Sequence, residues 1–180
     1  MNKKAQFYFI AAIVFASVFI AIITISNKAT SPNPPSFSEE GERIEIEISF
    51  LLDYFSRESI SDENAKNILV NLSNSYVQKF GEDKEIFFLF GKNNSLITLT
   101  GYKGEETELF INTGSGDTIV SETGRFQNNY TLAGKYSSLV LDGSRYNFTF
   151  YPGQNVYYLI KSSYNGEIFI SNGGTSSSNQ

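Results

Sequence analysis

The sequence of 180 residues contains no cysteine, no histidine and no tryptophan. Without cysteine the chain can form no disulfide, no thiolate nucleophile and no cysteine-based metal site. Without histidine it lacks the side chain that most often transfers protons near neutral pH, which excludes serine–histidine catalysis and ordinary zinc sites. We therefore predict that the protein is not an enzyme and holds no metal and no cofactor.

Acidic residues are missing from the first 38 positions, whose only charged side chains are Lys3, Lys4 and Lys28. All 19 acidic residues follow this segment, where they outnumber the basic ones. Neutralisation of phosphates supplies most of the affinity for nucleic acids, so an acidic domain without a basic patch is a poor nucleic-acid binder. We predict no nucleic-acid partner.

A long uncharged run, Phe7 to Ile25, begins close to the N-terminus. At about 1.5 Å per residue it spans roughly 29 Å as a helix, which matches a hydrocarbon core of about 30 Å. Lys3 and Lys4 stand before the run, and positive charges favour the cytoplasmic side. We predict a transmembrane helix at residues 7–25 in contact with membrane lipid. Residues 1–6 would then be cytoplasmic and the C-terminal domain extracytoplasmic, in a single-pass protein of the cell membrane. A cleaved secretory signal and a buried core helix are the alternatives.

The residues before the run, Lys3-Lys4-Ala5-Gln6, resemble the class III signal of archaeal type IV pilin-like proteins. In that family a prepilin-type peptidase cuts after a small residue preceded by basic residues, and the mature chain begins with Gln. The resemblance implies processing between Ala5 and Gln6 by such a peptidase, and association with other pilin-like subunits. Ile10 departs from the family pattern, because many members have Glu there. An ordinary signal anchor is the alternative.

Composition divides the remaining chain into a linker, a domain and a tail. Residues 26–38 are rich in proline and serine and predict an extended linker. The domain is expected over residues 39–171, and residues 172–180, rich in Gly, Ser and Asn, are expected to be a disordered tail. Two amphipathic helices are predicted in the domain, at residues 39–57 and 62–80, because apolar residues recur there every three or four positions.

From Glu85 onward, short apolar runs alternate with turns that contain Gly and Asn, and the 16 Phe and 11 Tyr of the chain also favour sheets. Asp142-Gly143 and Asn165-Gly166 are strong hairpin signals. The predicted fold class is α+β: the N-terminal transmembrane helix, two amphipathic helices, and an antiparallel β-sandwich or bent meander of about eight strands.

Four asparagines fit the acceptor pattern for N-glycosylation in a domain outside the membrane, with chance matches as the alternative. They are Asn71, Asn93, Asn129 and Asn147, of which Asn93 lies in an expected hairpin turn. The loop from Asn112 to Asp117 has oxygen ligands but lacks the spacing of a calcium loop, and turn chemistry explains it.

These features together predict a non-enzymatic, membrane-anchored surface protein, either a pilin-like subunit or another component of an appendage or the cell envelope. The alternative is a stand-alone anchored binding domain for a glycan or a protein partner. Tyr151, Tyr157, Tyr158 and Tyr164 bear on this alternative, because they are either packing residues or an aromatic platform for a glycan.

Overall fold

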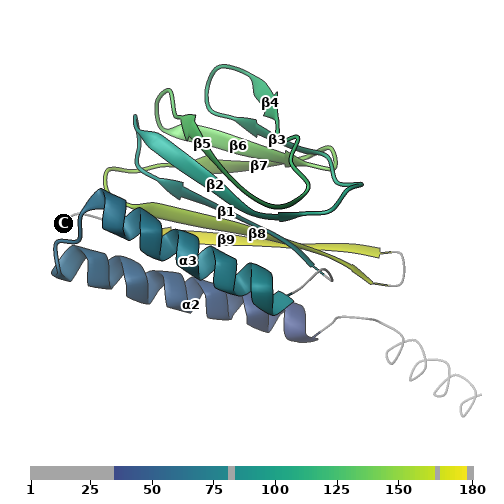
Figure 1. Ribbon diagram of the computed structural model, residues 1–180, viewed down its shortest axis with the longest axis horizontal. Helices are drawn as coiled ribbons and strands as arrows, with labels where there is room; N and C mark the ends of the chain where they lie inside the picture. The colour runs from purple at the N-terminus through teal and green to yellow at the C-terminus, as the bar shows by residue number, and fades with distance from the viewer. Residues whose placement is uncertain (1–34, 81–83, 165–166, 178–180) are drawn as a thin grey trace, which may run out of the picture. The chain divides into compact units, whose positions relative to one another are not determined.

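The computed structural model describes residues 35–80, 84–164 and 167–177 of the chain (Figure 1). The processing residues Ala5 and Gln6, the apolar run Phe7–Ile25 and the linker up to residue 34 lie outside these ranges. Residues Ser36–Gln180 make up one compact unit.

Helix α2 spans Pro35–Arg57, so it begins four residues before the expected start. Proline is well tolerated in the first turn of a helix, because the missing N–H would have no intrahelical partner there. Ile44, Ile48 and Leu52 form the buried face of the helix. Their spacing of four places them in one row toward the core.

Helix α3 spans Asp62–Phe80, the range expected from the sequence. Ser61 caps it, since its hydroxyl accepts a hydrogen bond from the Asn64 backbone N–H at 3.4 Å. Asp62 and Glu63 stand in the first turn and Lys79 in the last, and both placements favour the helix dipole.

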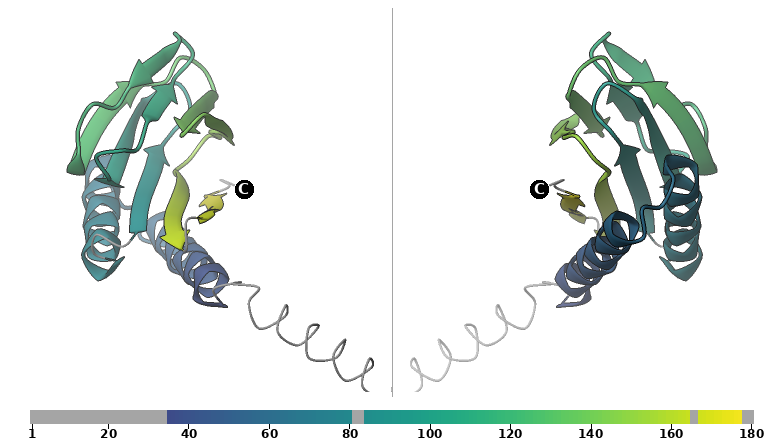
Figure 2. Two further views of the ribbon diagram at one scale, coloured as in Figure 1. Left: turned by 90° about the vertical axis from the view of Figure 1, so that its right-hand side faces the viewer. Right: turned by 90° about the vertical axis from the view of Figure 1, so that its left-hand side faces the viewer.

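Within the described ranges, nine strands form two antiparallel sheets. The five-stranded sheet has the order β5 (Gly124–Thr131), β2 (Leu96–Lys103), β1 (Lys84–Gly91), β8 (Asn155–Tyr164), β9 (Glu167–Ser176). The four-stranded sheet has the order β4 (Asp117–Ile119), β3 (Leu109–Asn112), β6 (Tyr136–Leu141), β7 (Ser144–Thr149). The helices lie on one face of the five-stranded sheet and the four-stranded sheet lies on the other, which makes three layers (Figure 2).

Strand β1 lies at the centre of this arrangement and contributes to both cores. Ile86, Phe88 and Phe90 face the helices. Phe87 and Leu89 face the four-stranded sheet. Successive side chains of a strand point to opposite faces, so a strand covered on both sides reads as an unbroken apolar run.

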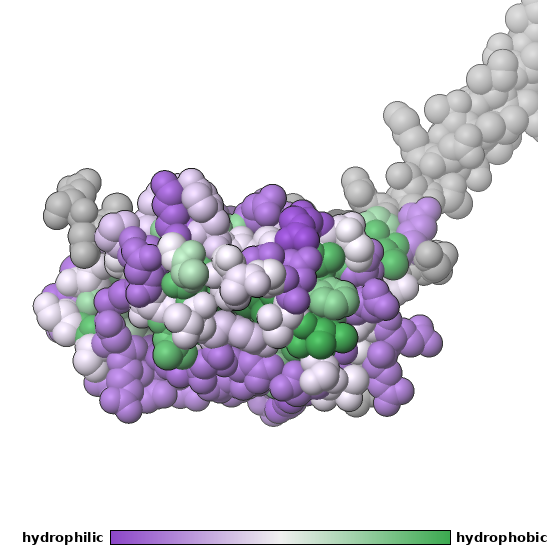
Figure 3. All heavy atoms as spheres, turned by 90° about the horizontal axis from the view of Figure 1, so that it is seen from above, coloured by the Kyte–Doolittle hydropathy of each residue, from purple (hydrophilic) through white to green (hydrophobic). Residues whose placement is uncertain are grey.

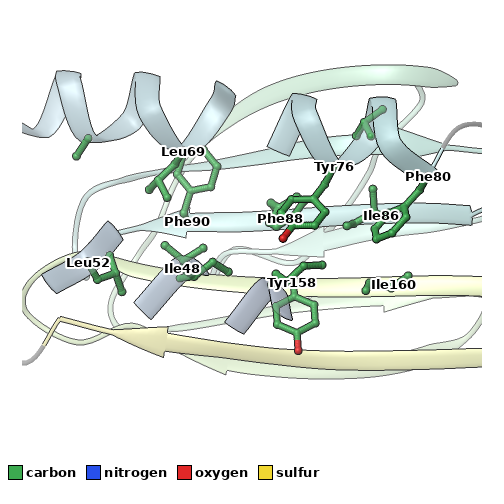
Figure 4. Close-up of a cluster of buried hydrophobic side chains, with 14 of the residues drawn as sticks. Ile48, Leu52, Leu69, Tyr76, Phe80, Ile86, Phe88, Phe90, Tyr158 and Ile160 are labelled. Atoms are coloured by element: carbon green, nitrogen blue, oxygen red, sulfur yellow. The ribbon is translucent and has the colours of Figure 1, made fainter. Parts of the chain in front are cut away.

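The core between the helices and the five-stranded sheet contains a group of aromatic rings (Figure 4). The ring of Tyr76 on α3 lies 6.0 Å from that of Phe88. Tyr158 on β8 donates a hydrogen bond to the Gly41 carbonyl of α2 at 2.9 Å. A Cβ atom at Gly41 would lie 2.9 Å from the Ser171 hydroxyl oxygen, so glycine lets α2 approach β8 and β9 closely.

The predicted fold class is wrong. The described residues are mostly β, with two helices and nine strands in two antiparallel sheets, where a transmembrane helix, two further helices and about eight strands were expected. In these ranges no helix is long and apolar enough to cross a membrane. The strand that the sequence did not predict is β5. It lies at the edge of its sheet and only Phe126 on it is buried, so its sequence does not show the alternation of apolar and polar residues that is typical of a strand. The expected disordered tail also begins too early, because β9 continues to Ser176.

Candidate interaction surface

The outward face of α2 carries a row of exposed apolar side chains. Ile46, Phe50 and Tyr54 are 57%, 70% and 46% exposed. They are spaced by four residues, so they lie one above another along the helix. The buried row of the same helix lies two positions away in sequence, on the opposite face. We call Ile46, Phe50 and Tyr54 the α2 row.

The other large apolar side chains exposed in the described part of the chain do not share an element. They are Leu96, Ile119, Tyr136, Tyr151 and Ile168, each on a different strand or loop. Seen from above, hydrophobic atoms form small separate groups among hydrophilic ones (Figure 3). Single exposed apolar residues are normal on a protein surface, whereas several in a row mark an interaction site.

Charged residues border the α2 row. Arg43 donates a hydrogen bond to Glu47 at 3.1 Å, and farther along the same helix Arg57 pairs with Asp53 one turn before it. The hydrogen bond to Glu47, together with the charge of Glu47, raises the pKa of the Arg43 guanidinium above its ordinary value. Both pairs are exposed, and such pairs add little to stability. They form a polar border beside a narrow apolar strip, as is typical of protein interfaces.

The sequence analysis did not predict the α2 row, although the four-residue spacing of its members is visible in the sequence. The helix predicted at residues 39–57 rested on one apolar series, Ile44, Ile48, Leu51 or Leu52, and Phe55. A second series with the same spacing, shifted by two positions, is found in the same segment. A helix that packs on one side needs only one such series, so the second one indicated an additional contact.

Two of the glycosylation candidates lie on α3 and in the β1–β2 turn. Asn71 is exposed on α3, but Ser73 of its motif is fully buried and donates a hydrogen bond to the Val70 carbonyl. Asn93 is half-buried in the turn, and Ser95 beside it is exposed.

The other two candidates lie on edge strands. Asn129 is exposed on β5, and its side-chain oxygen accepts hydrogen bonds from Lys66 at 2.9 Å and Thr98 at 2.8 Å. Asn147 is exposed on β7. The asparagine side chains of Asn71, Asn129 and Asn147 are thus more accessible than that of Asn93, which the turn had favoured.

The loop from Asn112 to Asp117 is held by internal contacts. The Arg145 guanidinium donates to both carboxylate oxygens of Asp117, at 2.8 Å and 3.2 Å. Its hydrogen bonds, with one from Asn112, lower the pKa of the Asp117 carboxyl. This carboxylate is therefore already balanced by a cation. The described residues contain no cluster of three side chains suited to a metal ion.

The tyrosines do not form a platform in the described structure. Tyr158 is buried toward α2, whereas Tyr157 packs toward the four-stranded sheet with its ring 4.9 Å from that of Phe148. Burial raises the pKa of Tyr157 to about 12. Tyr151 is exposed alone in a loop, and the side chain of Tyr164 lies outside the described part. Neighbouring strand positions point to opposite faces, so adjacent tyrosines do not share one binding face.

An open groove of about 230 Å³ lies between the start of α3 and the β1–β2 hairpin. Its charged side chains are largely paired, because Lys92 contacts Asp62 at 2.5 Å and Lys66 contacts Asn129. Few charged groups in the groove are therefore left to bind a ligand, and the α2 row is the stronger candidate for an interaction site.

Comparison with protein families, curated proteins and solved structures gives no match. No family therefore supplies a function for this chain. The α2 row is the surface feature that points to one.

Proposed function

We propose that the protein is a non-enzymatic component of the cell surface that associates with further copies of itself as a pilin-like subunit. The apolar segment 7–25 would hold it at the cell membrane, with the domain from Ser36 on the outer side. The observation that carries the proposal is the α2 row, on the helix that follows the linker.

The size of the row sets the strength of the contact. Full burial of one large apolar side chain contributes about 1.5–3 kcal/mol, and the α2 row is already partly covered. A contact that buries the rest contributes on the order of 3 kcal/mol, which corresponds to a weak affinity between free molecules. Confinement to a membrane raises the local concentration of subunits, so a weak contact is sufficient there.

The charges around the row act against association of identical chains. Glu42 and Glu45 lie near Ile46, and two copies would bring these carboxylates together. Salt screens such repulsion over a distance of about 8 Å at physiological ionic strength. Association through the α2 row is therefore expected to strengthen as salt increases, since apolar burial remains while repulsion weakens.

Disulfide trapping tests the proposal directly, because the native chain contains no cysteine. The variant Ser49→Cys places a thiol beside Phe50 in the full-length protein in its membrane. Under mild oxidation we expect cross-linked dimers, and a reduction of at least threefold when Phe50→Ala is added. Ser121→Cys, at an exposed position two residues after the exposed Ile119, serves as the matched control and should give few dimers.

Equal cross-linking of the two cysteine variants, or no effect of Phe50→Ala, would contradict self-association through α2. A chain that remains monomeric at all surface densities would favour the stand-alone binding domain instead. In that case the α2 row would contact a different protein.

A further inference from the structure

A group of polar side chains lies where the two sheets meet at one end of the domain. Lys161 on β8 places its Nζ atom 2.7 Å from Asp142 Oδ2 in the β6–β7 turn, and 3.5 Å from Glu85 Oε1 on β1. The three side chains are only 13%, 29% and 16% exposed, in the order Lys161, Asp142, Glu85. Glu85 and Lys161 belong to the five-stranded sheet and Asp142 to the four-stranded one, so the contact bridges two layers.

The Asp142 carboxylate is oriented through both of its oxygens. Oδ1 accepts a hydrogen bond from the Glu108 backbone N–H at 3.0 Å, while Oδ2 faces Lys161. The Asp142 N–H in turn donates to the Glu108 carbonyl at 3.0 Å, which fixes the turn to the start of β3. The carbon of this carboxylate is thus held next to an amine, and a fixed N–H donor lies on one oxygen.

Thr107 connects the amine to Glu85. Lys161 donates a hydrogen bond to the Thr107 hydroxyl at 2.5 Å, and that hydroxyl donates to Glu85 Oε1 at 2.5 Å. Thr107 is buried and is itself held by Lys103, which donates to its carbonyl at 3.1 Å. This chain of contacts is a path along which a proton can move from the Lys161 amine to the Glu85 carboxylate.

The second oxygen of Glu85 is unusual. Oε2 is buried and has no hydrogen-bond partner among the residues that the structure describes. A buried polar atom without a partner is costly and rare, and it is often found where a group takes part in chemistry. A partner-free carboxylate oxygen next to an amine has the capacity to accept and return a proton.

We propose that Lys161 and Asp142 condense into an isopeptide bond that links the two sheets covalently. The bond between Lys161 Nζ and Asp142 Cγ forms, the bond between Cγ and Oδ2 breaks, and Oδ2 leaves as water. The Lys161 ammonium supplies both protons of that water. One passes directly to Oδ2, and the other travels through Thr107 to Glu85 and returns to the leaving oxygen. No oxidant or reductant takes part, and Glu85 ends unchanged.

Each contact has a defined role in this step. The fixed distance between Nζ and the carboxylate provides the proximity that amide formation needs. The Glu108 N–H stabilises the negative charge that develops on Oδ1 during attack. Low exposure of the Lys161 and Glu85 side chains limits the access of water to the amine, although Asp142 itself lies in an exposed turn. The reaction takes place once per chain. The resulting cross-link would stabilise the domain covalently, as a disulfide does in proteins that contain cysteine.

Mass spectrometry of the full-length chain under denaturing conditions tests the proposal. We expect the mass to be lower than that of the uncondensed chain by one water molecule. After digestion with trypsin, segments 136–145 and 146–180 should remain joined as one branched peptide, since a modified Lys161 is not cut. A tryptic peptide that ends at Lys161, together with an intact mass equal to that of the uncondensed chain, would overturn the proposal.

Two variants separate chemistry from folding. Lys161→Arg keeps the positive charge and Glu85→Gln keeps the shape, and both should carry the full mass while retaining the circular dichroism of the native chain. If Glu85→Gln condenses as fast as the native chain, the role of Glu85 is refuted. Lys92→Arg is the matched control: it alters the exposed Lys92–Asp62 pair and should leave the loss of water unchanged.

Discussion

Replacement of Phe88 by alanine tests the layered core most directly. Phe88 is 1% exposed on β1 and lies between the sheet and α3, where its ring contacts Tyr76 (Figure 4). Truncation of a buried Phe to Ala costs about 3–5 kcal/mol, as lost transfer free energy and an unfilled cavity. The contact with an aromatic ring places the expected loss near the middle of that range, at about 4 kcal/mol. This is a large part of the 5–15 kcal/mol that stabilises an ordinary domain, in order of magnitude.

The assay is urea unfolding of a soluble fragment that covers Ser36–Gln180, the compact unit of the chain. With a slope of about 2 kcal/mol/M, a loss of about 4 kcal/mol lowers the midpoint by roughly 2 M. Phe50→Ala is the control, because a change on an exposed face away from special contacts usually stays within about 0.5 kcal/mol. If Phe88→Ala lowers the midpoint by no more than Phe50→Ala does, the assignment of the helix-facing core is wrong. A fragment that shows no cooperative transition would refute its independent folding as well.

Three further predictions concern titration and processing. Burial raises the pKa of Tyr157 to about 12, so the stability that its neutral form contributes is present below pH 10 and is lost as pH rises toward 12. Burial also raises the pKa values of Tyr76, Tyr130 and Tyr158, so absorbance titration of tyrosinate should show several late groups, with one fewer in Tyr157→Phe; an unchanged late amplitude in that variant would contradict the assignment. Hydrogen bonds from Arg145 lower the pKa of Asp117, so the stability that the ionised carboxylate contributes is present above its ordinary pKa of about 4 and is lost as pH falls below that value. The melting temperature should therefore fall less between neutral and acidic pH in Arg145→Ala than in the native chain. An equal fall in both chains would contradict the pairing. N-terminal sequencing of the native protein should find Gln6 first, and Ala5→Leu should block the cut; an uncut native chain would reject the pilin resemblance.

Local signals in the sequence were sufficient for the second helix and for most strands. The apolar residues that recur every three or four positions over 62–80 give the bounds of α3, and Ser61 caps its start, because periodicity and capping act over a few residues. The Asp142-Gly143 turn likewise separates β6 from β7, as expected for a hairpin. These features need no knowledge of distant parts of the chain.

Other features depend on which face of an element is covered, and the sequence alone does not contain that information. Strand β5 was missed because an edge strand buries little, and its pairing with β2 supplies the hydrogen bonds that its side chains do not predict. The α2 row and the buried row of α2 have the same spacing, and only the packing of the helix on the sheet decides which of them remains exposed.

The group around Lys161 is entirely a product of tertiary structure. Glu85, Asp142 and Lys161 are distant in sequence and stand in unremarkable contexts, on two strands and a turn. No local pattern links them, because side-chain contacts across sheets are set by strand order and register. Composition excluded thiol and imidazole chemistry from this chain, whereas the packing of one sheet on another brought an amine within 2.7 Å of a carboxylate. Residue types are fixed by the sequence alone, but distances between residues far apart in it exist only once the layers have assembled.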